Sequence, residues 1–504
     1  MSDPLPDLES GMAAADFERR PMLVGRVGKQ QVLVVKQGDE YFAVAAQCTH
    51  YHGPLVEGLL VDGTVRCPWH HACFELKTGQ VKRGPALDPL DRWQVDRQDD
   101  RIFVRRKLDP VGAPQLSRDK QPESVVIVGT GAAGLAAALT LRRAGYQRPL
   151  TLVSGETDPP YDRPNLSKDY LAGTAPPEWM PLRSDEFYRD HGIELALGTA
   201  VRELDVKQRK VKLQNGRELD FDRLLLATGA EPVRLQIAGA EPERVFYLRS
   251  WADCRAIIER AASAKRAVVL GASFIALEVA ASLRTRGLEV HVVGRDSVPM
   301  RRVLGEQVGE FLRRLHESRG TVFHLGQRIA RIAGQSVILS DGSTVDADFS
   351  VVGAGVRPVD ALARAAGIAT HDGVAVDDYL MSSANGIYAA GDIASWPDKH
   401  SGDRLRVEHW VVAQRQGATA ARNMLGAREK FTAVPFFWTQ QFDLAINYVG
   451  HASAQDNVRI EGDLEKRDCA IRYEHQGRLA AVATIGRDLE SLKAELELER
   501  EGLP

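Results

Sequence analysis

Two segments of this 504-residue sequence share one pattern: a short apolar run, a turn that contains glycine, and a longer apolar stretch with helical spacing. The first runs from Val125–Val128 into Leu135–Gly145, and the second from Ala267–Leu270 into Ile275–Gly287. Each predicts the start of a βαβ unit, because a buried parallel strand is continuously apolar and its crossover is a helix. The two units start roughly 140 residues apart, which predicts two doubly wound, nucleotide-binding domains rather than a short-period repeat.

The residues before the first unit show a different sequence pattern. Up to about Lys107 they contain short β-type runs broken by Gly and Asp, such as Val32–Lys36, Tyr41–Ala45 and Ile102–Arg105. These runs predict a small all-β domain. Leu108–Glu123 is rich in Pro, Asp, Lys and Gln and has no apolar period, so we expect a linker there.

The end of the chain shows a mixed pattern. From about Val434 onward, β-like runs at Ala445–Val449 and Leu479–Thr484 precede a closing helix of alternating Leu and Glu. This pattern predicts a C-terminal α+β domain.

Charge and composition narrow the classes of protein. The net charge of −3 argues against an overall field that would gather nucleic acid. Met1–Gly11 has no basic or apolar region typical of a secretory signal. The uncharged stretch Val125–Leu141 contains three glycines and predicts strand, turn and helix rather than a membrane span. Five sparse cysteines are typical of a reducing cytoplasm, where we expect the protein: Cys48, Cys67, Cys73, Cys254 and Cys469.

A metal-binding pattern lies in the all-β segment. Cys48-Thr-His50 is followed, after sixteen intervening residues, by Cys67-Pro-Trp-His70. In a Rieske [2Fe–2S] centre two thiolates hold one iron and two imidazoles hold the other, so two loops with one Cys and one His each meet its needs. The alternative is a Cys2His2 zinc site, whose paired ligands are usually two to four residues apart. We predict that these two Cys and two His residues are cluster ligands.

The words CTHYHGPL and CPWHHACF around these ligands resemble Rieske ferredoxins of the low-potential kind. High-potential relatives carry an extra Cys in each loop, where this chain has Gly53–Pro54 and Trp69. His71 stands where such ferredoxins usually have Gly. We expect His52 and His71 to be exposed polar residues, and Cys73 to be a small buried residue.

The first glycine turn is a complete G-x-G-x-x-G, formed by Gly129, Gly131 and Gly134. These glycines permit a tight turn and close approach of a pyrophosphate, and the helix N-terminus supplies partial positive charge. Glu156 follows the next apolar run, Leu150–Val153, where a carboxylate can hold ribose hydroxyls. Together these features predict a dinucleotide site.

Four further words resemble the FAD-dependent ferredoxin reductases of aromatic-ring dioxygenase systems and the apoptosis-inducing factor family: Tyr161–Pro164, Leu166–Lys168, Ala227–Gly229 and Ala389–Asp392. The resemblance implies that Lys168 lies against the flavin and that Asp392 holds its ribityl chain. Alone, Lys168 would be interpreted as a solvated lysine at a helix start. The same words imply further cofactor contacts, from Arg163, Ala227, Thr228 and Gly229.

The second glycine turn reads Gly271-Ala-Ser273-Phe-Ile-Ala276 and departs from the full motif at two glycines. Ser273 leaves the backbone a little less room at a pyrophosphate. The resemblance implies an NAD(P)H domain, in which Glu278 approaches the nicotinamide carboxamide and Gly355 belongs to a closing loop near the nicotinamide. Lys168 and Glu278 are therefore the candidate catalytic residues.

Two tryptophans are candidates for flavin contact. Trp410 ends the word Glu408-His-Trp, and Trp438 ends Pro435-Phe-Phe-Trp. In the ferredoxin reductases, aromatic residues of these words border the flavin. The alternative is that both tryptophans are ordinary core residues.

The end of the run Glu289–Val293 bears on the choice of nicotinamide. NAD-specific sites place a carboxylate there, whereas this chain has Gly294 followed by Arg295. A guanidinium binds phosphate well, so we expect NADPH to be accepted. Two alternatives remain open: Arg295 points to solvent, or Asp296 supplies the ribose contact.

The resemblance covers essentially the whole chain. The order of its domains is similar to that of the Rieske-containing, apoptosis-inducing-factor-3-like subgroup. It implies a multidomain fold, an all-β Rieske domain followed by α/β FAD and NAD(P)H doubly wound domains and a C-terminal α+β domain. The expected order is 1–107 Rieske, 108–122 linker, 123–240 FAD-binding (first part), 241–360 NAD(P)H-binding, 361–433 FAD-binding (second part) and 434–504 C-terminal.

The implied activity is hydride transfer from nicotinamide C4 to flavin N5, then single-electron steps to the cluster and to an oxygenase, cytochrome or ferredoxin. A thiol–disulfide reductase is disfavoured because Asp158–Gly173 contains no cysteine. Two other classes stay open, an NAD(P)H oxidase or peroxide reductase and a redox-sensing interaction protein. We expect no nucleic-acid partner and no membrane span, and leave a homodimer open.

Overall fold

The computed structural model describes residues 5–112 and 121–501. Contacts divide the chain into two compact units. The first unit comprises residues 1–116, 143–145 and 487–503, and the second comprises 117–142, 146–486 and 504. The central part of the expected linker, 113–120, lies outside the described residues.

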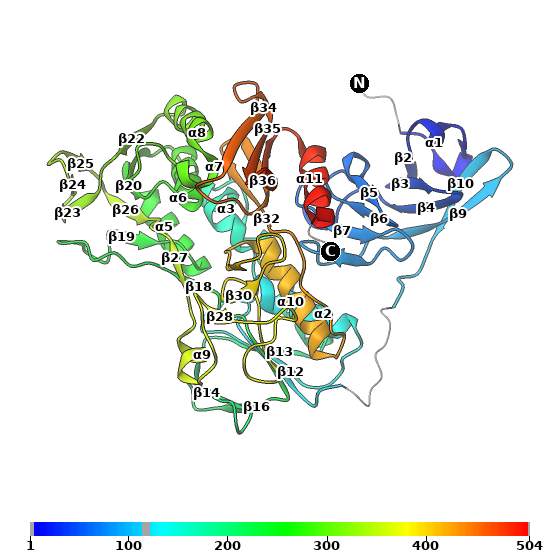
Figure 1. Ribbon diagram of the computed structural model, residues 1–504, viewed down its shortest axis with the longest axis horizontal. Coiled ribbons are helices and arrows are strands. Elements are labelled where there is room, and N and C mark those ends of the chain that lie inside the picture. The colour runs from blue at the N-terminus through cyan, green and yellow to red at the C-terminus, as the bar shows by residue number, and fades with distance from the viewer. Residues whose placement is uncertain (1–4, 113–120, 502–504) are drawn as a thin grey trace. The chain divides into compact units, whose positions relative to one another are not determined.

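The first unit is built on two antiparallel sheets (Figure 1). The larger sheet has the order β1-β10-β9-β4-β3-β2, and the smaller has the order β5-β6-β7-β8. Their bounds are β1 Met12–Ala13, β2 Met22–Val27, β3 Gln30–Gln37, β4 Glu40–Ala45, β9 Arg92–Gln98, β10 Arg101–Lys107, β5 Leu59–Val61, β6 Thr64–Arg66, β7 Cys73–Glu75 and β8 Val81–Arg83. The short helices of this unit before β9 are η1 Leu8–Ser10, α1 Asp16–Arg19 and η2 Leu55–Glu57.

Strand β3 supplies both cores of this unit, since side chains alternate across a strand. Leu33 and Val35 belong to the cluster that contains the ligand cysteines, whereas Val32 and Val34 belong to the cluster around Trp93. The predicted all-β segment is therefore confirmed, and its β-type runs lie in β3, β4 and β10.

The closing helix, α11 (Asp488–Glu501), packs with the first unit although it ends the chain (Figure 1). From the sequence we grouped this helix with residues 434–504. By its contacts, Arg487–Leu503 groups with residues 1–116. The helix thus follows the C-terminal domain in sequence and packs in the N-terminal unit.

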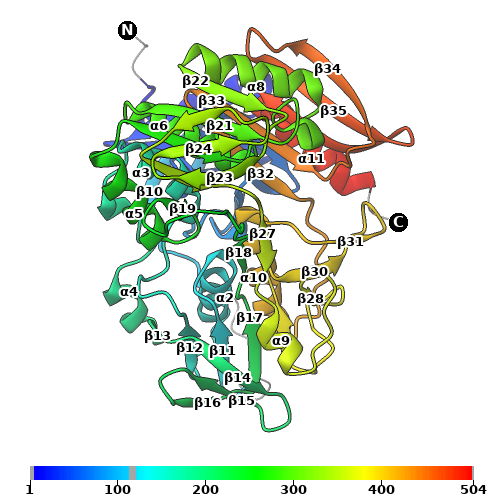
Figure 2. The ribbon, with the colours of Figure 1, turned by 90° about the vertical axis from the view of Figure 1, so that its left-hand side faces the viewer.

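The second unit contains a parallel five-stranded sheet of order β13-β12-β11-β17-β29 (Figure 2). Strand β11 is followed by α2, as the first glycine turn predicts. The last strand comes from a distant part of the sequence and pairs with β17, so two separate stretches build this domain. The bounds are β11 Val125–Val128, α2 Ala132–Arg143, β12 Leu150–Val153, β13 Ile193–Ala196, β17 Arg223–Leu226 and β29 Ile387–Ala389.

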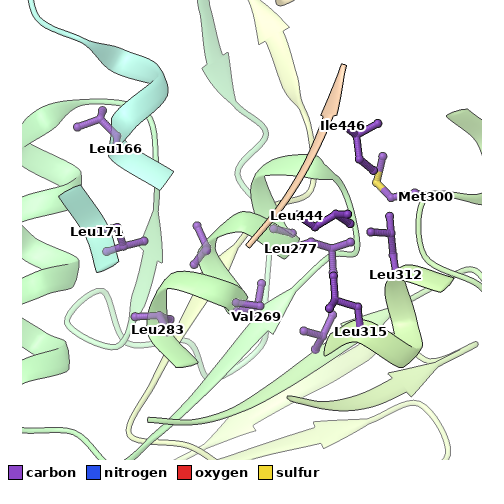
Figure 3. Packing of buried hydrophobic residues seen from close by; sticks show 14 of the residues in the cluster. Leu166, Leu171, Val269, Leu277, Leu283, Met300, Leu312, Leu315, Leu444 and Ile446 are labelled. Carbon is purple, nitrogen blue, oxygen red and sulfur yellow. The ribbon is translucent and has the colours of Figure 1, made fainter. Parts of the chain in front are cut away.

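A second parallel sheet has the order β19-β26-β20-β21-β22 and holds the second glycine turn. Helix α6 packs its apolar side chains into a core in which Leu277 and Leu283 lie near Val269 of β20 (Figure 3). The same core includes Leu444 and Ile446 from the C-terminal sheet. The bounds are β19 Val245–Tyr247, β20 Arg266–Leu270, α6 Phe274–Thr285, β21 Glu289–Gly294, β22 Thr321–Leu325 and β26 Phe349–Val352.

The C-terminal sheet is antiparallel, with the order β32-β33-β36-β35-β34. Its strands are β32 Phe436–Gln441, β33 Leu444–Gly450, β34 Asn457–Asp463, β35 Asp468–His475 and β36 Arg478–Ile485. Both β-like runs expected after Val434 lie in this sheet. The multidomain order of all-β, two doubly wound domains and a C-terminal sheet is thus confirmed.

Smaller elements complete the second unit. The helices are η4 Arg163–Ser167, α3 Asp169–Ala172, η5 Pro177–Trp179, α4 Asp185–Asp190, α5 Trp251–Ala262, α7 Arg301–Leu304, α8 Glu306–Ser318, α9 Ala361–Ala365 and α10 Trp410–Met424. The strands are β14 Val201–Asp205, β15 Lys210–Leu213, β16 Glu218–Asp220, β18 Ala230–Pro232, β23 Ile329–Ala333, β24 Ser336–Leu339, β25 Thr344–Asp346, β27 Val356–Pro358, β28 Val374–Ala375, β30 Ala394–Pro397 and β31 Arg404–Leu405. Within residues 5–112 and 121–501, no helix is both long and apolar enough to cross a membrane.

Candidate functional site

The four predicted cluster ligands lie on two loops of the first unit. Cys48 and His50 follow β4, and Cys67 and His70 lie between β6 and β7. Both cysteines are buried, and the two imidazoles face each other with their Nδ1 atoms 3.2 Å apart. The structure therefore brings together a pair of sulfurs and a pair of ring nitrogens, as the sequence predicts.

Hydrogen bonding and burial perturb the protonation of these ligands. The Cys48 thiol donates to Cys67, which raises the pKa of Cys48 and lowers the pKa of Cys67. Backbone N–H groups of Trp69 and His70 also lower the Cys67 pKa. Burial lowers the pKa of His50 to about 3, so the imidazole is neutral, which is the form that binds metal.

The loops also fit a cluster sterically. A Cβ at Gly53 would lie 2.8 Å from the sulfur of Cys67, so a side chain at this position would crowd the ligand. Each iron of a Rieske centre takes two protein ligands, one pair of thiolates and one pair of imidazoles. In the described part of the chain, no three His, Cys, Asp or Glu side chains surround a single metal position. These four residues would hold the [2Fe–2S] cluster, and backbone N–H groups to the sulfurs would tune its potential.

His71 is buried, so the expectation that it is an exposed polar residue is wrong. Its Nδ1 lies 3.1 Å from Oε2 of Glu495, and its Nε2 lies 3.2 Å from Oγ of Ser491. Its backbone has a φ of 61°, in the left-handed region that favours glycine. His52 is exposed and Cys73 is buried, as expected.

The first glycine turn has the geometry of a dinucleotide cradle. A Cβ at Gly129 would lie 2.0 Å from the carbonyl oxygen of Ala227, and one at Gly134 would lie 1.9 Å from that of Gly129. Nothing lies within 4 Å of a Cβ at Gly131, so this side of the turn is open. Close packing on two glycines and free space at the third fit a pyrophosphate against the N-terminus of α2.

Two arginines hold the carboxylates that the sequence assigns to FAD. Arg163 donates to Oε1 of Glu156 at 2.8 Å, and the Tyr161 hydroxyl donates to Oε2 at 2.6 Å. Arg249 donates to Asp392 at 2.8 Å. Arg249 precedes α5 and was not predicted from the sequence. Its place in a Leu-Arg-Ser motif is the one signal that could have drawn attention to it.

The motif residues after β17 lie beside the same turn. The carbonyl oxygen of Ala227 is the atom that a Cβ at Gly129 would meet. The hydroxyl of Thr228 donates to the carbonyl oxygen of Val359 at 2.8 Å, and Gly229 has a φ of 71°. These residues therefore line the junction between β11 and β17, beside the first glycine turn.

The two candidate catalytic residues form an ion pair. Nζ of Lys168 lies 2.8 Å from Oε2 of Glu278, and their side chains are 11% and 4% exposed. Lys168 is therefore not a solvated lysine. The same carboxylate accepts from the hydroxyls of Ser167, at 2.5 Å, and Thr439, at 2.6 Å. Ser167 and Thr439 were missed as members of this site, although each adjoins a predicted residue.

The second glycine turn is built differently. A Cβ at Gly271 would lie 2.3 Å from the carbonyl oxygen of Gly353, which explains why this glycine is retained. Ser273 caps α6: its hydroxyl donates to the same carbonyl at 3.2 Å and accepts from the N–H of Ala276. Gly355 has a φ of 96° and nothing within 4 Å of a Cβ, so the closing loop leaves open space.

The end of β21 carries the residues expected to read the nicotinamide cofactor's phosphate. Gly294 is its last residue, and the Arg295 side chain is exposed. Asp296 is paired with Arg302 at 3.1 Å. Both side chains of this pair are largely exposed.

Both candidate tryptophans are half-buried. Trp410 is the first residue of α10, and Trp438 lies in β32 opposite Asn447. Neither is among the fully buried core residues, and their contact with the flavin stays a prediction.

Three protein families match this chain. They are described as pyridine nucleotide-disulphide oxidoreductase, over residues 123–417, Rieske [2Fe-2S] domain, over 11–94, and reductase C-terminal, over 436–501. Together these matches extend through both units.

Individual proteins similar to this chain belong to the same kinds of family. Human apoptosis-inducing factor 3 is 35% identical over 94% of this chain and 81% of that protein. The ferredoxin–NAD(+) reductase component of the anthranilate 1,2-dioxygenase system of Burkholderia cepacia is 34% identical, over 72% of this chain and 91% of that protein. The solved complex of putidaredoxin reductase with putidaredoxin matches with a TM-score of 0.72 at 31% identity, over 75% of this chain and 93% of that one. The chain therefore belongs to the pyridine nucleotide-disulphide oxidoreductase family, as an NAD(P)H-dependent flavoprotein oxidoreductase with FAD and a Rieske [2Fe–2S] cluster, related to apoptosis-inducing factor 3 and the ferredoxin reductases.

Proposed function

We propose that this protein passes electrons from NAD(P)H through FAD to its own Rieske cluster and then to a separate electron-acceptor protein. The observation that carries the proposal is the ligand set of the first unit, two buried cysteines and two half-buried histidines with their Nδ1 atoms 3.2 Å apart, in the same chain as a pyridine nucleotide-disulphide oxidoreductase domain. A cluster with imidazole ligands has a higher potential than an all-thiolate cluster, which makes it a suitable acceptor from reduced flavin.

When bound, FAD accepts a hydride from the nicotinamide, and the cluster accepts electrons singly. The chain's residues supply binding and orientation. Three donors, Ser167, Lys168 and Thr439, fix both oxygens of the Glu278 carboxylate in a buried position. Such a carboxylate can orient the nicotinamide carboxamide, while the Lys168 ammonium supplies positive charge toward the flavin.

An oxygenase, a cytochrome or a ferredoxin is the proposed class of final acceptor. The relatives include the reductase component of a dioxygenase system, and one solved relative is a complex of a reductase with putidaredoxin. We propose that the Rieske domain here delivers electrons to such a protein. We also propose that NADPH serves as donor, because Gly294 places no carboxylate at the end of β21 and Arg295 is exposed beside it.

Turnover with an external acceptor tests this function against an NAD(P)H oxidase. Wild-type protein should reduce cytochrome c with little oxygen consumption. His70→Ala removes one imidazole ligand, so it should abolish acceptor reduction while NADPH still bleaches the flavin absorbance. An unchanged acceptor rate in His70→Ala, or oxygen consumption that accounts for all NADPH used, would contradict the proposal.

A further inference from the structure

The acidic face of α11 meets a basic face of the Rieske domain in the first unit. Arg66, at the end of β6, is 3% exposed and lies 3.3 Å from Glu495, whose side chain is fully buried. Arg66 also pairs with Glu499 at 2.8 Å, and Arg83 of β8 pairs with the same carboxylate. Two arginines of the domain are thus matched by two glutamates of one helix.

His71 makes the third connection, and it adjoins the cluster ligand His70. Its ring contacts Ser491 and Glu495 of α11 through its two nitrogens. At a φ of 61° a glycine would be the easier residue. The two contacts to α11 give a physical reason for a histidine at this position.

The contacting side chains follow a helical repeat. Ser491, Glu495 and Glu499 are spaced by four residues and therefore lie on one face of α11. Apolar residues of the same helix, Leu492 and Leu498, are also buried. The interface combines apolar burial with buried ion pairs, and a buried charge is costly without its counterpart, so the pairs favour one register.

Chain order makes this contact unusual. Helix α11 begins at Asp488, three residues after β36 ends at Ile485, and the reductase C-terminal family match extends to residue 501. By sequence the helix is therefore the end of the reductase portion. By packing it belongs with the Rieske domain.

We propose that α11 is a docking helix whose partner is the Rieske domain of the same chain. It attaches that domain to the reductase noncovalently, in addition to the covalent linker near residues 108–122. Recognition is by charge: Glu495 and Glu499 bind Arg66 and Arg83, and His71 adds its contacts beside the ligand loop.

Cleavage of the linker in full-length holoprotein tests this attachment. A specific protease site inserted after the exposed Gly112 would sever the covalent connection. The two fragments should then co-elute on size exclusion at low ionic strength, with the mass of the uncleaved protein. Truncation after Gly486, combined with the same cleavage, should let them separate. Separation of the wild-type fragments, or a mass that differs from that of the uncleaved protein, would overturn the proposal.

Point variants locate the attachment. Glu495→Gln combined with Glu499→Gln should weaken binding between the cleaved fragments at least tenfold, measured by calorimetry on remixing. The control is Glu501→Gln, which removes an exposed carboxylate from the same helix and should leave the affinity unchanged. Equal affinities for the double variant and this control would contradict the proposal.

A second variant guards against misfolding of the double mutant. His71→Gly suits the local φ and removes both contacts to α11, so the cluster should load normally by its visible absorbance. We expect a smaller loss of affinity, about threefold to tenfold. A cluster-loaded His71→Gly protein with wild-type affinity would show that these contacts do not hold the helix.

Discussion

The two glycine turns of the second unit both allow close packing between a strand and the following helix, but with different residues. The first has no room for a methyl at its third position, where a Cβ on Gly134 would lie 1.9 Å from a carbonyl oxygen. The second already carries a methyl there, on Ala276, and leaves Gly353 as the residue that must lack one. In the first turn the glycine that permits close packing is Gly134, on the helix. In the second turn it is Gly353, on the loop that faces the helix.

The turns also differ at the end of the following strand. After the first, Glu156 supplies a carboxylate that is held by Arg163. After the second, Gly294 supplies none, and the nearby Asp296 lies 3.1 Å from Arg302 in an exposed ion pair. The first turn is thus followed by a held carboxylate and the second by none, and we propose that the second site accepts a phosphate on its ligand's ribose for this reason.

The largest effect should come from Gly134→Ala. The added methyl cannot avoid the backbone of Gly129, so we expect a loss of about 1–3 kcal/mol in stability and a protein largely free of FAD. Flavin content after gel filtration measures this. The matched change in the second turn, Ala276→Gly, should retain FAD. If Gly134→Ala binds FAD as the wild type does, the steric contrast between the turns is wrong.

A carboxylate placed at the end of β21 should impose a preference for NADH. Gly294→Asp adds a Cβ 3.1 Å from a methyl of Leu325 and 3.2 Å from the Cβ of Ala272, so each neighbour must move by a few tenths of an ångström. Repulsion of a 2′-phosphate should lower kcat/KM for NADPH at least tenfold, about 1.4 kcal/mol or more, with little change for NADH. Equal losses with both nucleotides would show that this position does not face the ribose.

Arg295→Ala should act in the same direction with a smaller magnitude. An exposed guanidinium contributes less to phosphate binding than a buried one, so we expect about threefold to tenfold weaker use of NADPH. In the wild type the preference for NADH should not exceed about tenfold, or 1.4 kcal/mol. Steady-state kinetics with both nucleotides checks this, and a thousandfold preference for NADH in the wild type would contradict it.

The smallest effect should follow Ser273→Gly, which restores one of the two missing glycines of the motif in the second turn. Glycine is nearly as good as serine at a helix N-cap, so the loss of stability should be a few tenths of a kcal/mol. The melting temperature and the KM for NADPH should both stay close to wild type. A large rise in KM would mean that the hydroxyl of Ser273 binds the nucleotide rather than capping α6.

Elements and sites whose residues are close neighbours in the chain could be predicted from the local sequence. Strands β11 and β12 were predicted with their observed bounds, because a continuous apolar run determines a buried parallel strand. The cluster ligands were predictable for a similar reason, since each loop presents one Cys and one His within a few residues.

Contacts between distant residues were not predictable from local pattern. His71 was expected to be exposed, but its partners on α11 are more than 400 residues away. The same applies to Arg249, which pairs with Asp392 across 143 positions, and to Thr439, which reaches Glu278 across 161. A single sequence shows which residues can pair, whereas the fold determines which of them meet.

An anaerobic titration with NADPH, followed by visible absorbance and EPR, tests the central claim most directly. Full reduction takes three electrons per chain, two on FAD and one on the cluster. Because each NADPH donates two electrons, full reduction should need about 1.5 equivalents of NADPH. We expect the EPR signal of a reduced [2Fe–2S] cluster with nitrogen ligands to grow as the flavin absorbance bleaches. Bleaching that is complete at one equivalent, with the cluster silent to further NADPH, would contradict electron transfer from flavin to cluster.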